Sequence, residues 1–233
     1  MEEASARCAE YWERVSHLPF FKELDVKNPE KTIPISWHMD GVKVFKTQKV
    51  WAYSHSSAIR KGPSIDTKTL FLLFRDNVMV KPHTHDAVGN LIAYVMDVLQ
   101  SGMFPSKDPD GNPFPPNTVQ AQKAGTYFAG GWCAAFACFK ADLEGRVLAH
   151  KLVRNWASDS ICEHCLASKL PQFSYGDFSD SAAYWECMFT HQQFLMLNPP
   201  GKTSSWVNVR GWDISRNLDD PWFLILLFVA RTH

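Results

Sequence analysis

Three β-rich runs followed by one run of helical periodicity constrain most strongly what this chain can fold into. The runs are TIPISWHM (32–39), KVWAYSHSSAI (49–59) and TLFLLFRDNVMV (69–80), and the segments between them carry turn-forming and charged residues. Three successive strands with short links predict an antiparallel meander. In residues 85–102 apolar side chains recur at helical spacing, at positions 88, 91, 92, 95, 96 and 99, which predicts an amphipathic helix.

A proline-rich segment and a fourth β-rich run follow this helix. Residues 104–117 contain five prolines and predict an exposed loop, and GGWCAAFACFKADLEG (130–145) predicts a strand. Because the helix carries the chain across the sheet, we expect the fourth strand to lie beside the first. The order predicts an α/β (mixed α+β) fold, and it resembles the RNase H-like fold, a mixed sheet flanked by helices.

Two acidic residues, Asp40 and Asp142, stand at the ends of the first and fourth β-rich runs. Asp40-Gly41 is also a hairpin-turn signal, and a surface carboxylate needs no further role. Carboxylates on adjacent strand ends would instead give Mg²⁺ or Mn²⁺ the hard oxygen ligands that these ions prefer, with Glu144 as a supplement. Such metal ions activate water and stabilise the leaving oxygen in phosphodiester cleavage.

Four further residues have the spacing of zinc ligands. Cys162 and Cys165 form a C-x2-C pair, and Cys187 and His191 follow as C-x3-H, a spacing that places both on one face of a helix over residues 182–197. Three thiolates and one imidazole predict a closed structural zinc site, with His164 as a weaker substitute. The alternative is a core helix in which Cys187 is a small hydrophobe and His191 is solvated. A thioredoxin-like redox role is disfavoured, because the sequence before the C-x2-C pair lacks the strand-to-helix context of such a motif.

Two other groups of residues have both a functional and a structural interpretation. His83, His85 and Asp86 suggest a metal cluster, although we expect a solvated loop that leads into the helix. A basic segment interleaved with Trp51 and Tyr53 is either a phosphate-contacting face or a set of solvated connectors. Its members are Lys43, Lys46, Lys49, Arg60, Lys61 and Lys68.

Composition gives no sign of a polyanion-binding protein and argues against a secreted or membrane-spanning one. The 24 basic and 24 acidic side chains cancel, so the chain as a whole has no field that would attract a polyanion. The charged N-terminus lacks the apolar core of a signal peptide, and six cysteines are few for a disulfide scaffold, which predicts an intracellular protein. The longest apolar stretch, residues 221–230, is about half of a membrane span and predicts a buried strand, so we expect no membrane partner.

The chain also resembles a protein family. The stretches IPISWHMDGVKVF, VWAYSHSSAI, FKADLEGRVLAHKLVRNWASDSICEHCLAS and VNVRGWDIS resemble transposon-derived RNase H-like proteins that are abundant in some unicellular algal genomes. The resemblance implies that Asp40 and Asp142 are the first two acids of a DDE-type transposase, with Ala141 in place of the usual glycine. It further implies a DNA partner, a nuclear rather than cytoplasmic location and no small-molecule cofactor. The third acid of that family would have to be Asp213, Asp219 or Asp220. These residues lie where a member of the family would only be entering the region that carries its third acid.

Together these observations predict an organisation and two functions. An N-terminal helical appendage (1–30) precedes an RNase H-like core (31–155), a C2CH zinc-binding helical segment (156–200) and a C-terminal segment (201–233) at which a member of the family would be truncated. The predicted function is metal-dependent DNA strand cleavage or transfer, degenerate if the third acid is missing. The alternative is a non-catalytic, zinc-stabilised module that binds nucleic acid or protein. The sequence does not define an oligomeric state.

Overall fold

The computed structural model describes residues 2–17, 21, 24–45, 48–81, 83–154, 157–162, 164–177, 179, 181–187, 189–197, 204–210 and 212. The chain divides into two compact units. The first unit consists of residues 1–142 and 205–212, and the second consists of residues 143–204 and 213–233. The predicted buried strand at 221–230 and the acids Asp213, Asp219 and Asp220 lie outside the described residues.

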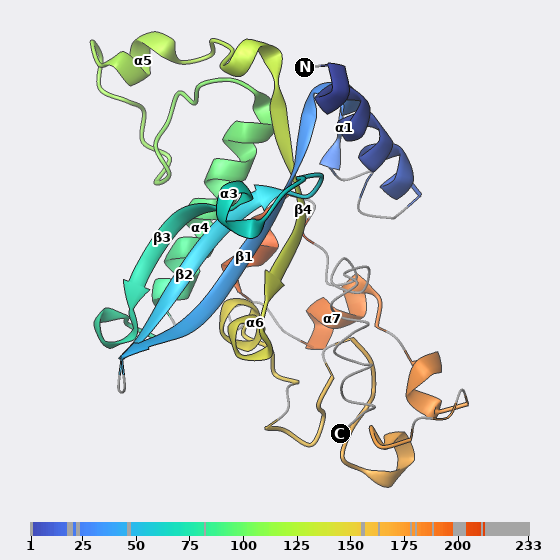
Figure 1. Cartoon of the computed structure of the whole chain (residues 1–233). Coiled ribbons are helices and arrows are strands. Elements are labelled where there is room, and N and C mark those ends of the chain that lie inside the picture. The colour runs from blue at the N-terminus through green and yellow to red at the C-terminus, as the bar shows by residue number, and fades with distance from the viewer. Residues whose placement is uncertain are drawn as a thin grey trace. The chain divides into compact units, whose positions relative to one another are not determined.

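The first unit is built on a mixed sheet. Its strands are β1 (Thr32–Phe45), β2 (Gln48–Ser57), β3 (Thr69–Arg75) and β4 (Cys133–Ala141). They lie in the order β3-β2-β1-β4, with β2 antiparallel to both β1 and β3, and with β4 parallel to β1 (Figure 1). The predicted meander and the predicted place of the fourth strand beside the first are both confirmed.

Strand β1 differs from the prediction in where it ends. The strand continues through Asp40 and Gly41, which pair with Ala52 and Trp51 of β2, so the prediction that it stops at Asp40 is wrong. The hairpin-turn interpretation of Asp40-Gly41 is wrong for the same reason. Beyond Gly41 the sequence VKVF favours an extended backbone, and β2 supplies a partner for it as far as Phe45.

Helix α4 (His83–Ser101) covers one face of the sheet. Its predicted apolar stripe is confirmed, because Val88, Ile92 and Met96 are buried. Alternating residues of the strands supply the opposing surface, and the indole Nε1 of Trp37 donates to Met96 Sδ at 3.2 Å. The core of the first unit therefore lies between α4 and the aromatic face of β1 and β2.

Helix α1 (Glu2–Val15) packs near the beginning of β1 (Figure 1). Trp12 is fully buried with Leu24 and Ala135, and its indole Nε1 donates to the backbone oxygen of Thr32 at 2.7 Å. Ala135 pairs with Pro34, which places it on the sheet face opposite the one that α4 covers. The segment expected as an appendage thus shares a core with the sheet.

The remaining helical elements are short. In the first unit they are η1 (Pro29–Lys31), α3 (Ser64–Thr67), η2 (Asp76–Val78), α5 (Val119–Lys123), η3 (Ala129–Gly131) and η6 (Ser205–Asn208). In the second unit they are α6 (Leu143–His150), η4 (Pro171–Phe173), η5 (Ala183–Glu186) and α7 (His191–Leu197).

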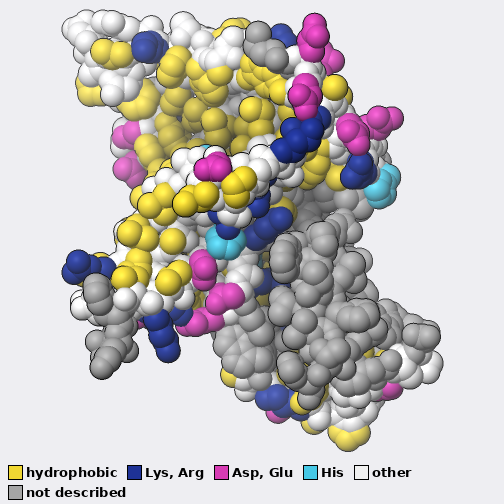
Figure 2. Space-filling model, viewed as in Figure 1, with side chains coloured by type: hydrophobic (Ala, Val, Ile, Leu, Met, Phe, Trp, Pro, Cys, Tyr) yellow, Lys and Arg dark blue, Asp and Glu magenta, His cyan; other side chains and the backbone are white. Residues whose placement is uncertain are grey.

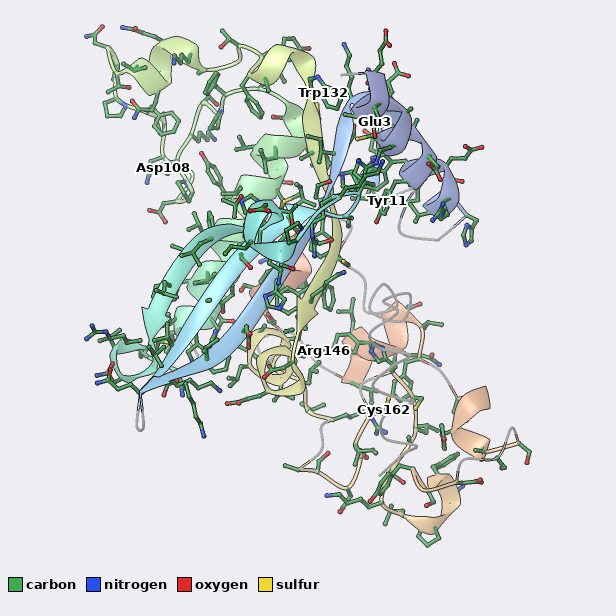
Figure 3. All side chains as sticks on the ribbon, viewed as in Figure 1. Glu3, Tyr11, Asp108, Trp132, Arg146 and Cys162 are labelled. Atoms are coloured by element: carbon green, nitrogen blue, oxygen red, sulfur yellow. The ribbon has the colours of Figure 1, made fainter. Side chains whose placement is uncertain are left out.

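The proline-rich segment at 104–117 is mostly exposed and forms no helix or strand, as predicted. The carboxylate of Asp108, labelled in Figure 3, accepts hydrogen bonds from the backbone N–H groups of Asp110 and Asn112 and so holds its tight turn. Among the described helices, none is long and apolar enough to span a membrane.

The contact between η6 and α4 gives a first testable prediction. Ser205 Oγ donates to the backbone oxygen of Asp86 at 2.8 Å, and a Cβ at Gly89 would collide with that hydroxyl. We expect Gly89→Ala to destabilise the contact by about 1 kcal/mol, because overpacking outweighs the gain in helix propensity. Hydrogen exchange should become faster in residues 204–210. Ala87→Gly, at an exposed position of the same helix, is the control; equal exchange in both variants would contradict the prediction.

Candidate functional site

The first unit brings the two predicted carboxylates to neighbouring positions. The parallel register of β1 and β4 ends at the pair Met39 and Ala141, so Asp40 and Asp142 are the next residues on the two strands. Side chains alternate between the faces of a sheet, and the register therefore places both acids on the face that carries His38 and Lys140. Asp40 is partly buried and Asp142 is exposed. The predicted juxtaposition arises where β4 ends, although β1 itself continues.

The charges around His38 show which groups share this part of the surface. Burial lowers the pKa of His38, and the positive charges of Lys68 and Lys140 lower it further. The negative charges of Asp40 and Asp142 act on the same imidazole and raise its pKa, but burial has the largest effect. Figure 2 shows charged side chains of both signs close together on the face in view. His38 is thus neutral at pH 7 and adds no charge that would repel a cation.

Two carboxylates suffice for one mode of metal binding. Mg²⁺ keeps several waters and is commonly held by one or two carboxylates together with substrate phosphates. Among the residues that the structure describes, no three His, Cys, Asp or Glu side chains are grouped to hold one metal ion. Asp40 and Asp142 could therefore hold such an ion without a third protein ligand.

Glu144 does not extend this pair as a strand residue. The fourth strand ends at Ala141, and Glu144 lies in the first turn of α6, where it is exposed. The expectation that Glu144 shares the face of Asp142 by strand alternation is wrong, because the backbone changes to helix after Asp142.

The predicted zinc ligands lie in the second unit. Cys162 and Cys165 are reduced and sit in a small apolar cluster, and Cys187 is partly buried. The predicted helix over 182–197 is wrong for its first half, because η5 ends at Glu186 and α7 begins only at His191. Cys187 and His191 therefore do not share the face of one helix; the side chain of His191 is outside the described residues. His164, the weaker substitute, is buried with its Nε2 2.9 Å from the guanidinium of Arg146.

The histidines at 83–85 belong to the first turn of α4, so the expectation of a solvated loop is wrong. His85 is buried, and its Nδ1 lies 2.5 Å from the hydroxyl of Tyr53. Its ring packs edge-on against Trp51, with 5.5 Å between ring centroids. Tertiary packing against two aromatic side chains explains why a polar sequence is buried here.

The basic segment does not present stacking platforms. Trp51 and Tyr53 are both fully buried, and the ammonium of Lys49 lies 4.0 Å from the centroid of the Trp51 ring. The aromatics between the lysines are thus core residues, and Lys46 lies outside the described residues. Lys68 is the member of this group whose charge acts on His38, beside the two acids.

His38 and Lys140 were not identified as site residues from the sequence, although a signal was present. Each stands two residues before one of the acids, in H-M-D and K-A-D, and the two pair directly in the parallel register. Period-2 alternation on two strands would have placed them beside Asp40 and Asp142.

No protein-family model, curated protein or solved structure matches this chain. The case for a function therefore depends on the geometry of its own residues.

Proposed function

We propose that the first unit is an RNase H-like domain of transposase ancestry that cleaves phosphodiester bonds in DNA at a divalent metal site. Asp40 and Asp142 are its metal ligands, and Mg²⁺ or Mn²⁺ is its cofactor. One observation carries the proposal: the parallel register ends at Met39 and Ala141, so both acids follow at the same edge of the sheet.

The topology supports the assignment. A three-stranded meander, a crossing helix and a fourth strand parallel to the first form the order β3-β2-β1-β4, which is the arrangement expected of this fold. The resemblance of the motifs around Asp40 and Asp142 to transposon-derived proteins points to the same chemistry and to DNA as the substrate.

The groups around the acids suit a phosphodiester. Asp40 and Asp142 would hold the metal ion, which when bound would supply an activated water and stabilise the leaving oxygen. The water oxygen would form a bond to phosphorus, the bond from phosphorus to the leaving oxygen would break, and the water proton would pass to solvent. Lys68 and Lys140 place positive charge on the same face, where it favours the phosphate anion.

The alternative is a non-catalytic module, stabilised by zinc in its second unit, that binds nucleic acid or protein. It is favoured by the fact that, among the described residues, no three His, Cys, Asp or Glu side chains are grouped to hold one metal ion. The two functions differ in whether the metal site turns over a phosphodiester.

A plasmid-nicking assay with Mg²⁺ or Mn²⁺ tests the proposal. We expect the parent protein to nick supercoiled DNA and a chelator to abolish the activity. Asp40→Asn and Asp142→Asn should each lose activity by about a hundredfold or more, because the metal supplies several kcal/mol of transition-state stabilisation. Asp110→Asn, which changes an exposed acid of the proline-rich loop, is the matched control and should retain activity.

Mn²⁺ binding, followed by electron paramagnetic resonance, separates the possible outcomes. Binding that is lost in both Asn variants, without nicking by the parent, would support the non-catalytic alternative. Equal nicking by the parent and both variants would exclude the proposed metal site.

A further inference from the structure

The C-x2-C turn of the second unit has two hydrogen bonds aimed at its sulfur atoms. The backbone N–H of His164 donates to Cys162 Sγ at 3.3 Å, and the backbone N–H of Ala167 donates to Cys165 Sγ at 3.4 Å. In both cases the donor stands two residues after the cysteine. Such N–H groups stabilise negative charge on sulfur and fix the direction of each Sγ, as outer-shell donors do around metal-binding thiolates.

A guanidinium holds the same turn. Arg154 Nε donates to the backbone oxygen of Cys162 at 2.7 Å, and its Nη2 donates to that of Cys165 at 2.9 Å. The Arg154 guanidinium therefore fixes the backbone of the C-x2-C turn at both cysteines.

The segment that carries the other two predicted ligands runs beside this turn. The backbone N–H of Phe189 donates to the backbone oxygen of His164 at 2.7 Å, and the Arg154 guanidinium lies 5.3 Å from the centroid of the Phe189 ring. Cys187 is two residues before Phe189 and His191 is two residues after it. Both arms of the C-x2-C and C-x3-H pattern thus meet at one place in the second unit, where Figure 3 labels Cys162.

We infer that Cys162, Cys165, Cys187 and His191 bind one Zn²⁺ ion as a tetrahedral structural site of the second unit. No three of the described His, Cys, Asp and Glu side chains are grouped for one ion, so the metal has to draw the Cys187 side chain toward the C-x2-C turn. The backbone N–H of Phe189 already bonds to this turn. The inference is independent of the proposed cleavage, because a structural zinc ion serves a nuclease and a binding module equally well.

Two other roles for the cysteines are weaker. A cysteine that only fills an apolar core needs neither a backbone donor to its sulfur nor a guanidinium at its carbonyl oxygen, and Cys162 and Cys165 have both. A redox pair would alternate between dithiol and disulfide and would leave Cys187 without a role. A zinc site accounts for the N–H donors to sulfur, for the guanidinium at the turn and for the nearby Cys187.

Metal analysis of the full-length protein, purified in the presence of zinc and a reductant, tests the inference. We expect about one zinc per chain, as a closed four-ligand site requires. Cys162→Ser and Cys187→Ser should bind at least tenfold less zinc. Cys133→Ser, which changes a partly buried cysteine of the first unit, is the control and should retain the metal.

Two further measurements keep the test decisive if a serine variant fails to fold. His191→Cys should retain one zinc, because it exchanges one soft ligand for another, and Co²⁺ in the parent should show thiolate charge-transfer bands and the strong visible absorption of tetrahedral coordination. Reduced parent protein that contains no zinc, zinc that is unchanged in Cys162→Ser, or a Cys162–Cys165 disulfide in the freshly isolated protein would each overturn the inference.

Discussion

Replacing Trp12 with alanine is expected to destabilise the first unit by about 3–5 kcal/mol, the range for deleting a fully buried large aromatic side chain. The indole packs against Leu24 and Ala135, and Phe21 lies 6.1 Å from it between ring centroids. The substitution also removes the donor to the backbone oxygen of Thr32, the first residue of β1. Because domains of this size have a free energy of unfolding of about 5–15 kcal/mol, the substitution would remove a large part of the stability.

Urea unfolding and hydrogen exchange of β1 and β4 peptides measure this effect. Trp12→Phe keeps an aromatic ring and loses the hydrogen bond, so its loss should be smaller than that of Trp12→Ala. Tyr127→Ala, at a side chain that is 71% exposed, is the control and should change stability by at most about 0.5 kcal/mol. If Trp12→Ala unfolds at the same urea concentration as the parent, α1 does not contribute to the stability of the first unit and is an appendage.

The behaviour of α1 shows where sequence reasoning reached its limit. The sequence predicts a helical appendage within residues 1–30, but it does not say what this helix packs against. The partner, Ala135, is more than a hundred residues away and sits on the fourth strand. The strands and α4 were predictable because period 2 and period 3.6 are properties of neighbouring residues.

The same limit explains three of the local errors. Asp40-Gly41 is a turn signal in isolation, but pairing with β2 overrides it. His85 has a polar neighbourhood in the sequence, but it is buried by two aromatic residues from β2. The helix expected across Cys187 is interrupted because the N–H of Phe189 bonds to His164 instead of to a carbonyl one turn earlier. Each error comes from a contact between residues far apart in the chain.

The candidate site was predictable in part for a related reason. Asp40 and Asp142 could be paired from the order of the strands, since two parallel neighbours end at one edge. The cations around them depend on register, and Lys68 reaches the site from the segment before β3. A one-residue change in the pairing of β1 and β4 would place Lys140 and Asp142 on the face opposite His38 and Asp40.

Acidification is expected to destabilise the first unit in a window that begins near pH 6.5. Burial lowers the pKa of His85, and Lys81 lowers it further, while Asp86 and Asp76 act in the opposite direction. Burial likewise lowers the pKa of His38 and of His55. Above about pH 6.5 these imidazoles are neutral in both the folded and the unfolded chain, so they give no pH dependence.

Below that pH the unfolded chain binds protons that the folded chain does not, so stability falls until each lowered native pKa is reached. Each imidazole contributes a slope of up to about 1.4 kcal/mol per pH unit, and the three together up to about 4 kcal/mol per pH unit. His85→Asn removes one titrating group and keeps a polar atom near the Tyr53 hydroxyl. The variant should be less stable than the parent at pH 7 but lose stability less steeply between pH 7 and about pH 5.

Urea unfolding across this pH range, with hydrogen exchange of β2 and α4 peptides, provides the measurement. His83→Asn removes an exposed imidazole from the same helical turn and serves as the control. If the parent and His85→Asn lose stability with the same slope, then His85 takes up its proton inside the folded unit. The hydrogen bond between His85 and Tyr53 and the edge-on contact with Trp51 would then have to accommodate an imidazolium, which their burial argues against.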